Sequence, residues 1–148
     1  MKWLLDTNVI SESVRDRPNP AVLAWLGRRV PEQMAVSVVT MAELQDGASS
    51  AANATRRRQL TQWLDRDFPV SFADRILPLT SEILVDWLRL ARKLAAKGMT
   101  RAAPDLLIAA TARVHDLIVV SRNRRDFDGT GVIVYDPWSG ETHKMDEP

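Results

Sequence analysis

Short segments rich in β-branched residues alternate with segments of helical periodicity along this chain. The predicted strands lie at residues 2–5, 35–39, 117–120 and 131–135, and the proline in the short extended piece 76–79 places that piece at a sheet edge. The predicted helices lie at about residues 9–14, 20–29, 53–66 and 105–115, with a longer one between a cap at residue 80 or 81 and Gly98. Strands separated by helices pair in parallel through right-handed crossovers, so we expect an α/β fold.

The chain's 148 residues suit one compact domain with a sizeable core. We expect this domain to span residues 1–138 and residues 139–148 to form a polar C-terminal tail. No signal peptide is visible at the N-terminus, and no apolar run reaches the roughly 18 residues that cross a membrane. The absence of cysteine fits a reducing compartment, so we expect a cytoplasmic protein without membrane contact.

Four acidic residues stand where predicted strands end or predicted helices begin. Asp6, Glu43 and Asp126 follow apolar strands, and Asp105 opens a helix directly after Pro104. In open parallel sheets the carboxyl ends of the strands share one edge, where binding sites lie. Because clustered carboxylates repel one another, their convergence requires a cation or a shared proton. The sequence therefore predicts a metal site at this edge.

Each acid also has an ordinary structural explanation. Asp6 can cap a strand-to-helix turn, and Thr40 with Glu43 matches a helix capping box. Asp105 can interact favourably with the helix dipole, and Asp126 lies in a polar loop that is typical of a solvated turn. The metal-site hypothesis therefore depends on all four positions together.

The residue types limit which metal can bind. The chain has no cysteine and only two histidines, which excludes a zinc cage of nitrogen and sulfur ligands. An oxygen-bound ion is expected instead, Mg²⁺ first and Mn²⁺ as the alternative. His115 ends a predicted helix, where a histidine stabilises the carboxyl terminus.

The net charge of +1 does not by itself indicate nucleic-acid binding. Arg122, Arg124 and Arg125, however, lie directly beside Asp126. The planar guanidinium group can hold two phosphate oxygens at once. These arginines form either a solvated surface loop or a phosphate contact next to the acids.

Four stretches of the sequence resemble, in order, the motifs of PIN-domain ribonucleases. They are residues 4–10, residues 37–44 followed by Gly47, residues 105–112, and residues 119–127 followed by 136–138. The subgroup that the chain resembles is the VapC and FitB type, the toxin halves of bacterial toxin–antitoxin pairs. This resemblance covers the chain from Lys2 to about Trp138.

The resemblance implies a PIN-like three-layer α/β fold, with a parallel sheet of four or five strands wrapped by helices, and a magnesium-dependent endoribonuclease activity. Asp6, Glu43 and Asp105 match the family's acids as catalytic and metal-binding residues. Asp126 is the expected fourth member, although Asn123 occupies the position where some relatives carry aspartate. Asn123, Thr7, Ser121 and Arg122 are the supporting candidates, and Ser121 stands where the family usually has threonine.

The resemblance also implies partners: a cognate antitoxin, an RNA substrate, and a second copy of the chain in a homodimer or a larger toxin–antitoxin complex. Operator DNA would be bound only through the antitoxin. Two alternatives stay open at this point. One is a non-catalytic PIN-like regulatory or RNA-binding scaffold. The other is a phosphate-transfer enzyme with Asp6 as nucleophile, for which Asn8 stands where a second acid is expected.

Overall fold

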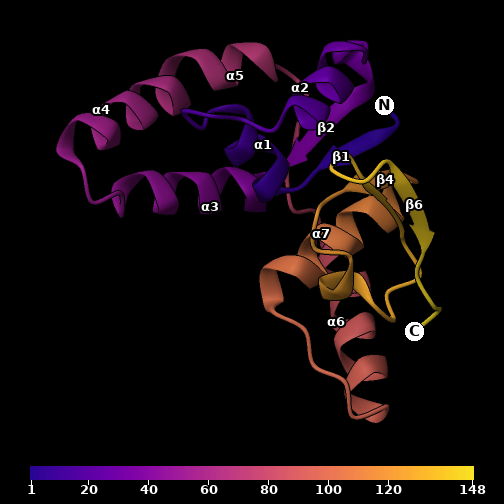
Figure 1. Ribbon diagram of the computed structural model, residues 1–148. Helices are drawn as coiled ribbons and strands as arrows, with labels where there is room; N and C mark the ends of the chain where they lie inside the picture. Colours follow the sequence, from indigo (N-terminus) through magenta and orange to yellow (C-terminus); the bar gives the residue numbers. More distant parts are fainter.

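A computed structural model describes residues 1–148 (Figure 1). Its strands are β1 (Trp3–Leu5), β2 (Met34–Ser37), β3 (Ile76–Leu77), β4 (Ile118–Val120), β5 (Ile133–Asp136) and β6 (Glu141–Lys144). Its α-helices are α1 (Thr7–Ser13), α2 (Pro20–Gly27), α3 (Val38–Ser49), α4 (Ala54–Gln62), α5 (Phe68–Ser71), α6 (Ser81–Ala96) and α7 (Ala103–Val114). Three short helical turns complete the chain: η1 (Pro31–Gln33), η2 (Trp63–Asp67) and η3 (Arg124–Phe127).

The strands form one sheet in the order β3-β2-β1-β4-β5-β6. The first five are parallel, and β6 runs antiparallel to β5. The chain starts in β1, continues outward on one side to β2 and β3, and then returns to the other side of β1 for β4. This reversal of strand order lies between β1 and β4, and such a switch point opens a crevice at the carboxyl ends of the strands.

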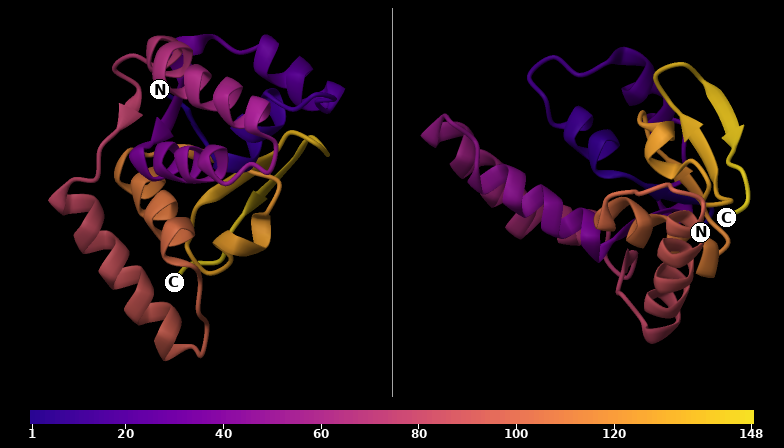
Figure 2. Two further views of the ribbon diagram at one scale, coloured as in Figure 1. Left: turned by 90° about the vertical axis from the view of Figure 1, so that its left-hand side faces the viewer. Right: turned by 90° about the horizontal axis from the view of Figure 1, so that it is seen from below.

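Alternate residues along the strands belong to two separate cores, as the period of two in a strand requires. On one face Leu4 and Val119 pack with buried residues of α6 and α7, among them Ile108. On the other face Leu5 and Val120 pack with α1, α2 and the α3–α5 region. Figures 1 and 2 show α6 and α7 on the side of the sheet opposite α1 and α2. The predicted three-layer α/β arrangement is confirmed.

The five parallel strands agree with the expected four or five, and residues expected as a polar tail add a sixth, antiparallel strand, β6. The backbone N–H of Gly140 donates to the carbonyl oxygen of Asp136 at 2.8 Å, which closes a hairpin between β5 and β6. Met145, the residue after β6, is buried. All four β6 residues are polar and none is fully buried, so the apolar pattern that predicts a strand is absent.

The capping-box interpretation of Thr40 and Glu43 is wrong. The helix α3 begins at Val38, three residues earlier than expected, and the Ser37 hydroxyl caps it by accepting from the N–H of Val39 at 3.1 Å. Thr40 is therefore an internal helical residue, and it is fully buried. Glu43 lies one turn further along α3 and is left available for contacts outside its own helix.

No helix of the structure has both the length and the apolar composition needed to cross a membrane.

Candidate active site

Asp6 stands directly after β1, at the switch point of the sheet. Its backbone N–H donates to the carbonyl oxygen of Val120 in β4 at 2.9 Å, which ties it to the neighbouring strand. Its side chain caps α1, where Oδ1 accepts from the N–H of Thr7 at 2.8 Å. The residue is only 5% exposed. The predicted capping role is thus correct, and it occupies one of the two carboxylate oxygens.

The second oxygen of Asp6 is held by side chains. The Ser121 hydroxyl donates to Asp6 Oδ2 at 2.7 Å, and Asn8 Nδ2 donates to the same oxygen at 3.0 Å. The Ser121 oxygen in turn accepts from Asn8 Nδ2 and from the backbone N–H of Asn123, both at 3.0 Å. Because every member of this network has a partner, the Asp6 carboxylate is fixed in orientation.

Glu43 reaches the same region from α3. Its Oε2 accepts a hydrogen bond from the Thr7 hydroxyl, which joins α3 to the first turn of α1. Asp105 lies in the first turn of α7, directly after Pro104, and is half-buried. Asp126 lies in η3, in the loop after β4. Three helical elements and the end of one strand therefore supply the four acids.

The four acids line one cavity of about 350 Å³ that has no apolar residue in its wall. The remaining wall residues are Thr7, Asn8, Ser11 and Asn123. None of the wall residues is basic, and none of the four acids takes part in an ion pair of the structure.

The negative charges affect one another's protonation. Burial raises the pKa of Asp6, hydrogen bonds from Ser121 and Thr7 lower it, and the charges of Glu43 and Asp126 raise it further. Burial, followed by repulsion from Asp126, Asp6 and Glu43, raises the pKa of Asp105 from its ordinary 3.8 to about 7. A carboxyl group with this pKa readily changes its protonation state when a cation enters the cavity.

The acids face one cavity, yet no group of three or more acidic or histidine side chains is arranged so that it could hold one metal ion. Repulsion between uncompensated carboxylates favours such separation. The residue types still fit a hard divalent cation, because several carboxylate oxygens and no basic side chain line the cavity. It offers no nitrogen or sulfur ligand of the kind that zinc prefers.

The supporting candidates take different positions. Thr7 binds Glu43, Ser121 binds Asp6, and Asn123 lines the cavity. Arg122 lies outside it, with its guanidinium carbon 5.4 Å from the centre of the Trp138 ring. His115 is exposed at the carboxyl end of α7, outside the cavity, as expected.

Two residues of the site were missed by the sequence interpretation. Asn8 links three parts of the site, since its Oδ1 also accepts from the backbone N–H of Arg122 at 3.2 Å. Ser11 lies one helical turn after Thr7 and lines the same cavity. The spacing of Thr7 and Ser11 by four residues in α1 is the sequence signal that places both on one face.

Residues 3–132 match a family model described as PIN domain. Over 135 residues the chain is 37% identical to Toxin FitB of Neisseria gonorrhoeae, and the aligned region covers 91% of this chain and 97% of that protein. It is 32% identical over 135 residues to VapC ribonuclease Y4jK of Sinorhizobium fredii, which covers 91% of this chain and 96% of the relative.

The similarity extends to solved structures. A chain in the crystal structure of FitAcB from Neisseria gonorrhoeae superposes with a TM-score of 0.86 at 37% identity, over 92% of this chain and 98% of that chain. VapBC-5 of Mycobacterium tuberculosis, a member of the VapBC family of toxin–antitoxin systems, gives a TM-score of 0.61 at 30% identity, over 86% and 91% of the two chains.

Proposed function

The chain belongs to the PIN-domain family, with relatives named as the FitB toxin and a VapC ribonuclease, and we propose that it is a metal-dependent endoribonuclease, the toxin of a toxin–antitoxin pair. The observation that carries this proposal is the cavity at the sheet's switch point, where four acids meet without a basic residue. Such a set of carboxylates is unfavourable in a folded protein unless it serves a cation or proton transfer.

Asp6, Glu43, Asp105 and Asp126 are the residues that would hold the cation, which we propose to be Mg²⁺ or, alternatively, Mn²⁺. When bound, a divalent ion lowers the pKa of water and stabilises negative charge on a phosphate. Asn123, whose side chain is neutral, would support this set from the wall of the cavity. Both Asp126 and Asn123 line the cavity, and we propose Asp126 as the fourth ligand because only its side chain carries the negative charge that attracts a cation.

The chain's own residues have distinct roles in this proposal. Ser121, Asn8 and the Thr7 N–H fix the Asp6 carboxylate before substrate arrives. The Thr7 hydroxyl holds Glu43, the acid that we propose orients the attacking water and accepts its proton. Attack by water, and not by the neighbouring ribose hydroxyl, leaves a 5′-phosphate and a 3′-hydroxyl on the cleaved RNA.

The test is cleavage of single-stranded RNA in Mg²⁺ by wild type, Asp6→Asn and Asp105→Asn. Both variants are expected to lose cleavage while keeping the wild-type circular dichroism spectrum. Asp65→Asn, at an exposed position in η2, is the matched control and should cleave normally. Unchanged cleavage in either site variant contradicts the assignment, and an intact wild type that cleaves no RNA with any divalent ion supports the non-catalytic scaffold.

We further propose that the protein acts in the cytoplasm as a homodimer held inactive by a cognate antitoxin. The similarity to VapBC-5, which belongs to a family of toxin–antitoxin systems, supports this partnership. Operator DNA would be bound only through the antitoxin. Co-expression with the protein encoded by a neighbouring gene, followed by co-purification and an RNA cleavage assay, tests both the complex and its inhibition.

A further inference from the structure

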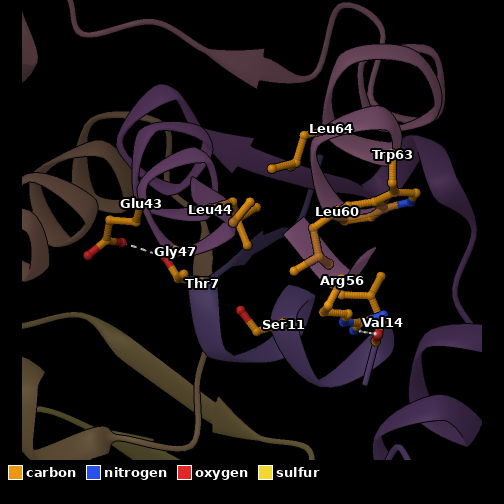
Figure 3. Close-up of a pocket in the computed structure, with 11 residues that line it drawn as sticks. Thr7, Ser11, Val14, Glu43, Leu44, Gly47, Arg56, Leu60, Trp63 and Leu64 are labelled. Atoms are coloured by element: carbon orange, nitrogen blue, oxygen red, sulfur yellow. Dashed lines mark hydrogen bonds between the residues drawn. The ribbon is translucent and has the colours of Figure 1, made fainter. Parts of the chain in front are cut away.

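A second cavity, of about 300 Å³, opens beside the acidic one. It lies between α1, α3, α4 and η2, and three residues, Thr7, Ser11 and Glu43, line both cavities. Figure 3 shows Glu43 and Thr7 at one end and Arg56 and Val14 at the other. The second cavity therefore continues from the candidate active site along the protein surface.

The walls of this cavity change in character along its length. Polar groups of Thr7, Ser11 and Glu43 stand at the end shared with the acidic site. Leucine side chains and Trp63 form the apolar wall beyond them. At the far end Arg56 donates a hydrogen bond to the carbonyl oxygen of Val14, which ties α4 to the end of α1. The cavity thus combines an apolar wall that includes an aromatic ring with hydrogen-bonding groups at its entrance.

Gly47 lines the cavity from inside α3 and has no packing reason to be glycine. A Cβ added at this position would meet no atom within 4 Å. Glycine inside a helix is unfavourable relative to alanine, because it loses more conformational freedom on folding. The missing side chain therefore leaves space in the cavity at a cost to the helix, which is expected where a ligand group approaches the backbone.

We infer that this second cavity binds one unpaired nucleobase of the RNA, from a nucleotide next to the cleaved phosphate; this inference rests on the proposed ribonuclease function. A phosphate held at the acids places the neighbouring nucleotide at the shared end of the two cavities. Proteins recognise single-stranded RNA by stacking bases on aromatic side chains and by hydrogen bonds to the base edges. Trp63 supplies the aromatic ring, and Thr7 and Ser11 supply the hydrogen-bonding groups.

The experiment fills the cavity and removes the base. Mixed-sequence RNA oligonucleotides first identify one that the wild-type protein cleaves at a single bond. Versions of this RNA with one abasic nucleotide on either side of that bond are then compared with the intact RNA. The protein variant is Gly47→Leu, which places a side chain in the cavity. Gly27→Leu is the matched control, because a Cβ at Gly27, the last residue of α2, also meets no atom within 4 Å.

For wild type, one abasic position should lower kcat/KM roughly ten- to a hundredfold, the range that corresponds to base–aromatic stacking. Gly47→Leu should show a similar loss on intact RNA, and the abasic nucleotide should then cause little further loss, because the two changes remove one interaction. Gly27→Leu should cleave like wild type. Gly47→Leu should melt at or above the wild-type temperature, since leucine favours a helix more than glycine does, so misfolding would not explain its loss.

Several results would overturn the inference. If wild type cleaves every abasic RNA at the same rate as the intact RNA, the proposed function stands and the second cavity does not bind a base. The same conclusion follows if Gly47→Leu cleaves normally but binds its antitoxin more weakly, since the cavity then receives a protein side chain. If wild type cleaves no RNA, the proposed function and this inference fail together.

Discussion

The Ser121 hydroxyl donates a 2.7 Å hydrogen bond to Asp6 Oδ2, although the two residues lie 115 positions apart in the chain. Both follow strands that pair directly, β4 and β1, so the pairing of these strands sets the distance between the two side chains. Ser121 is fully buried, and Asp6 is 5% exposed. Water therefore cannot readily replace this hydroxyl as the donor to the carboxylate.

Replacing Ser121 by alanine should weaken activity more than it changes the fold. The Asp6 carboxylate loses one donor, and the N–H of Asn123 and the amide of Asn8 lose their shared acceptor. Loss of such an orienting partner typically lowers activity roughly 10–100-fold, and unpaired buried groups cost about 1–3 kcal/mol of stability. RNA cleavage rates and thermal melting measure the two effects.

Ser121→Thr is the informative control, because it keeps the hydroxyl and adds only a methyl group. It should retain most of the activity, even though an extra buried methyl group can cost about 1–3 kcal/mol of stability. If the alanine variant is as active as wild type and the threonine variant, the hydrogen bond to Asp6 does not matter for catalysis.

The four acids at the carboxyl edge of the sheet could be predicted from the sequence because the order of strands and helices, not local detail, brings them together. Asp6 follows a buried strand and Asp105 begins a helix after proline, and the structure has both features. Glu43 lies at the same cavity as the other acids, although its local interpretation as a capping residue is wrong. The strand ends at Ser37, and Val38 and Val39 are helical despite their preference for strands. Tertiary packing overrides a weak local propensity there.

Other parts of the site could not be read from the sequence. The hydrogen bonds of Asn8 with Ser121 and with the backbone of Arg122 join segments far apart in the chain, so no local pattern reports them. The second cavity depends on how α1, α3, α4 and η2 are arranged relative to one another. The strand β6 forms only because β5 offers it an edge for pairing.

Divalent metal should stabilise the folded protein, because it compensates charges that otherwise repel. At a concentration 100 times its Kd, an ion that binds only the folded state adds about 2.7 kcal/mol. The melting temperature should rise in Mg²⁺ or Mn²⁺ relative to NaCl of equal ionic strength. Asp105→Asn should melt higher than wild type without metal and gain less from metal. Equal gains in both proteins would place the ion away from Asp105.

Without metal, stability should decrease as the pH rises from about 4 to about 7. The folded-state pKa of Asp105 is raised to about 7 from the ordinary 3.8. Between these values the folded chain keeps a proton that the unfolded chain has released, so the free energy of unfolding falls as pH increases. The raised pKa of Asp6 acts in the same direction.

Melting in a chelator across this pH range measures the effect. Other titrating groups contribute to both proteins, so the informative quantity is the difference between wild type and Asp105→Asn. The variant should lose less stability than wild type as the pH rises. Parallel pH profiles for the two proteins would show that Asp105 is not perturbed in the folded state.

Arg122 and Arg125 should bind RNA phosphates beside the acids. They line a wholly polar cavity with Asn123, Arg124 and Asp126, and they take part in none of the ion pairs of the structure. Binding of single-stranded RNA weakens with salt by about 0.7 logarithmic units for each phosphate that the protein neutralises. In Arg122→Ala and Arg125→Ala, kcat/KM should therefore fall. The slope of log kcat/KM against log salt concentration should also become shallower, by about 0.7 for each phosphate that is no longer bound.

Arg92→Ala, at an exposed position on α6, is the matched control and should keep the wild-type slope. If all four proteins give parallel salt plots, the arginine loop is a solvated surface and the RNA follows another path to the acids.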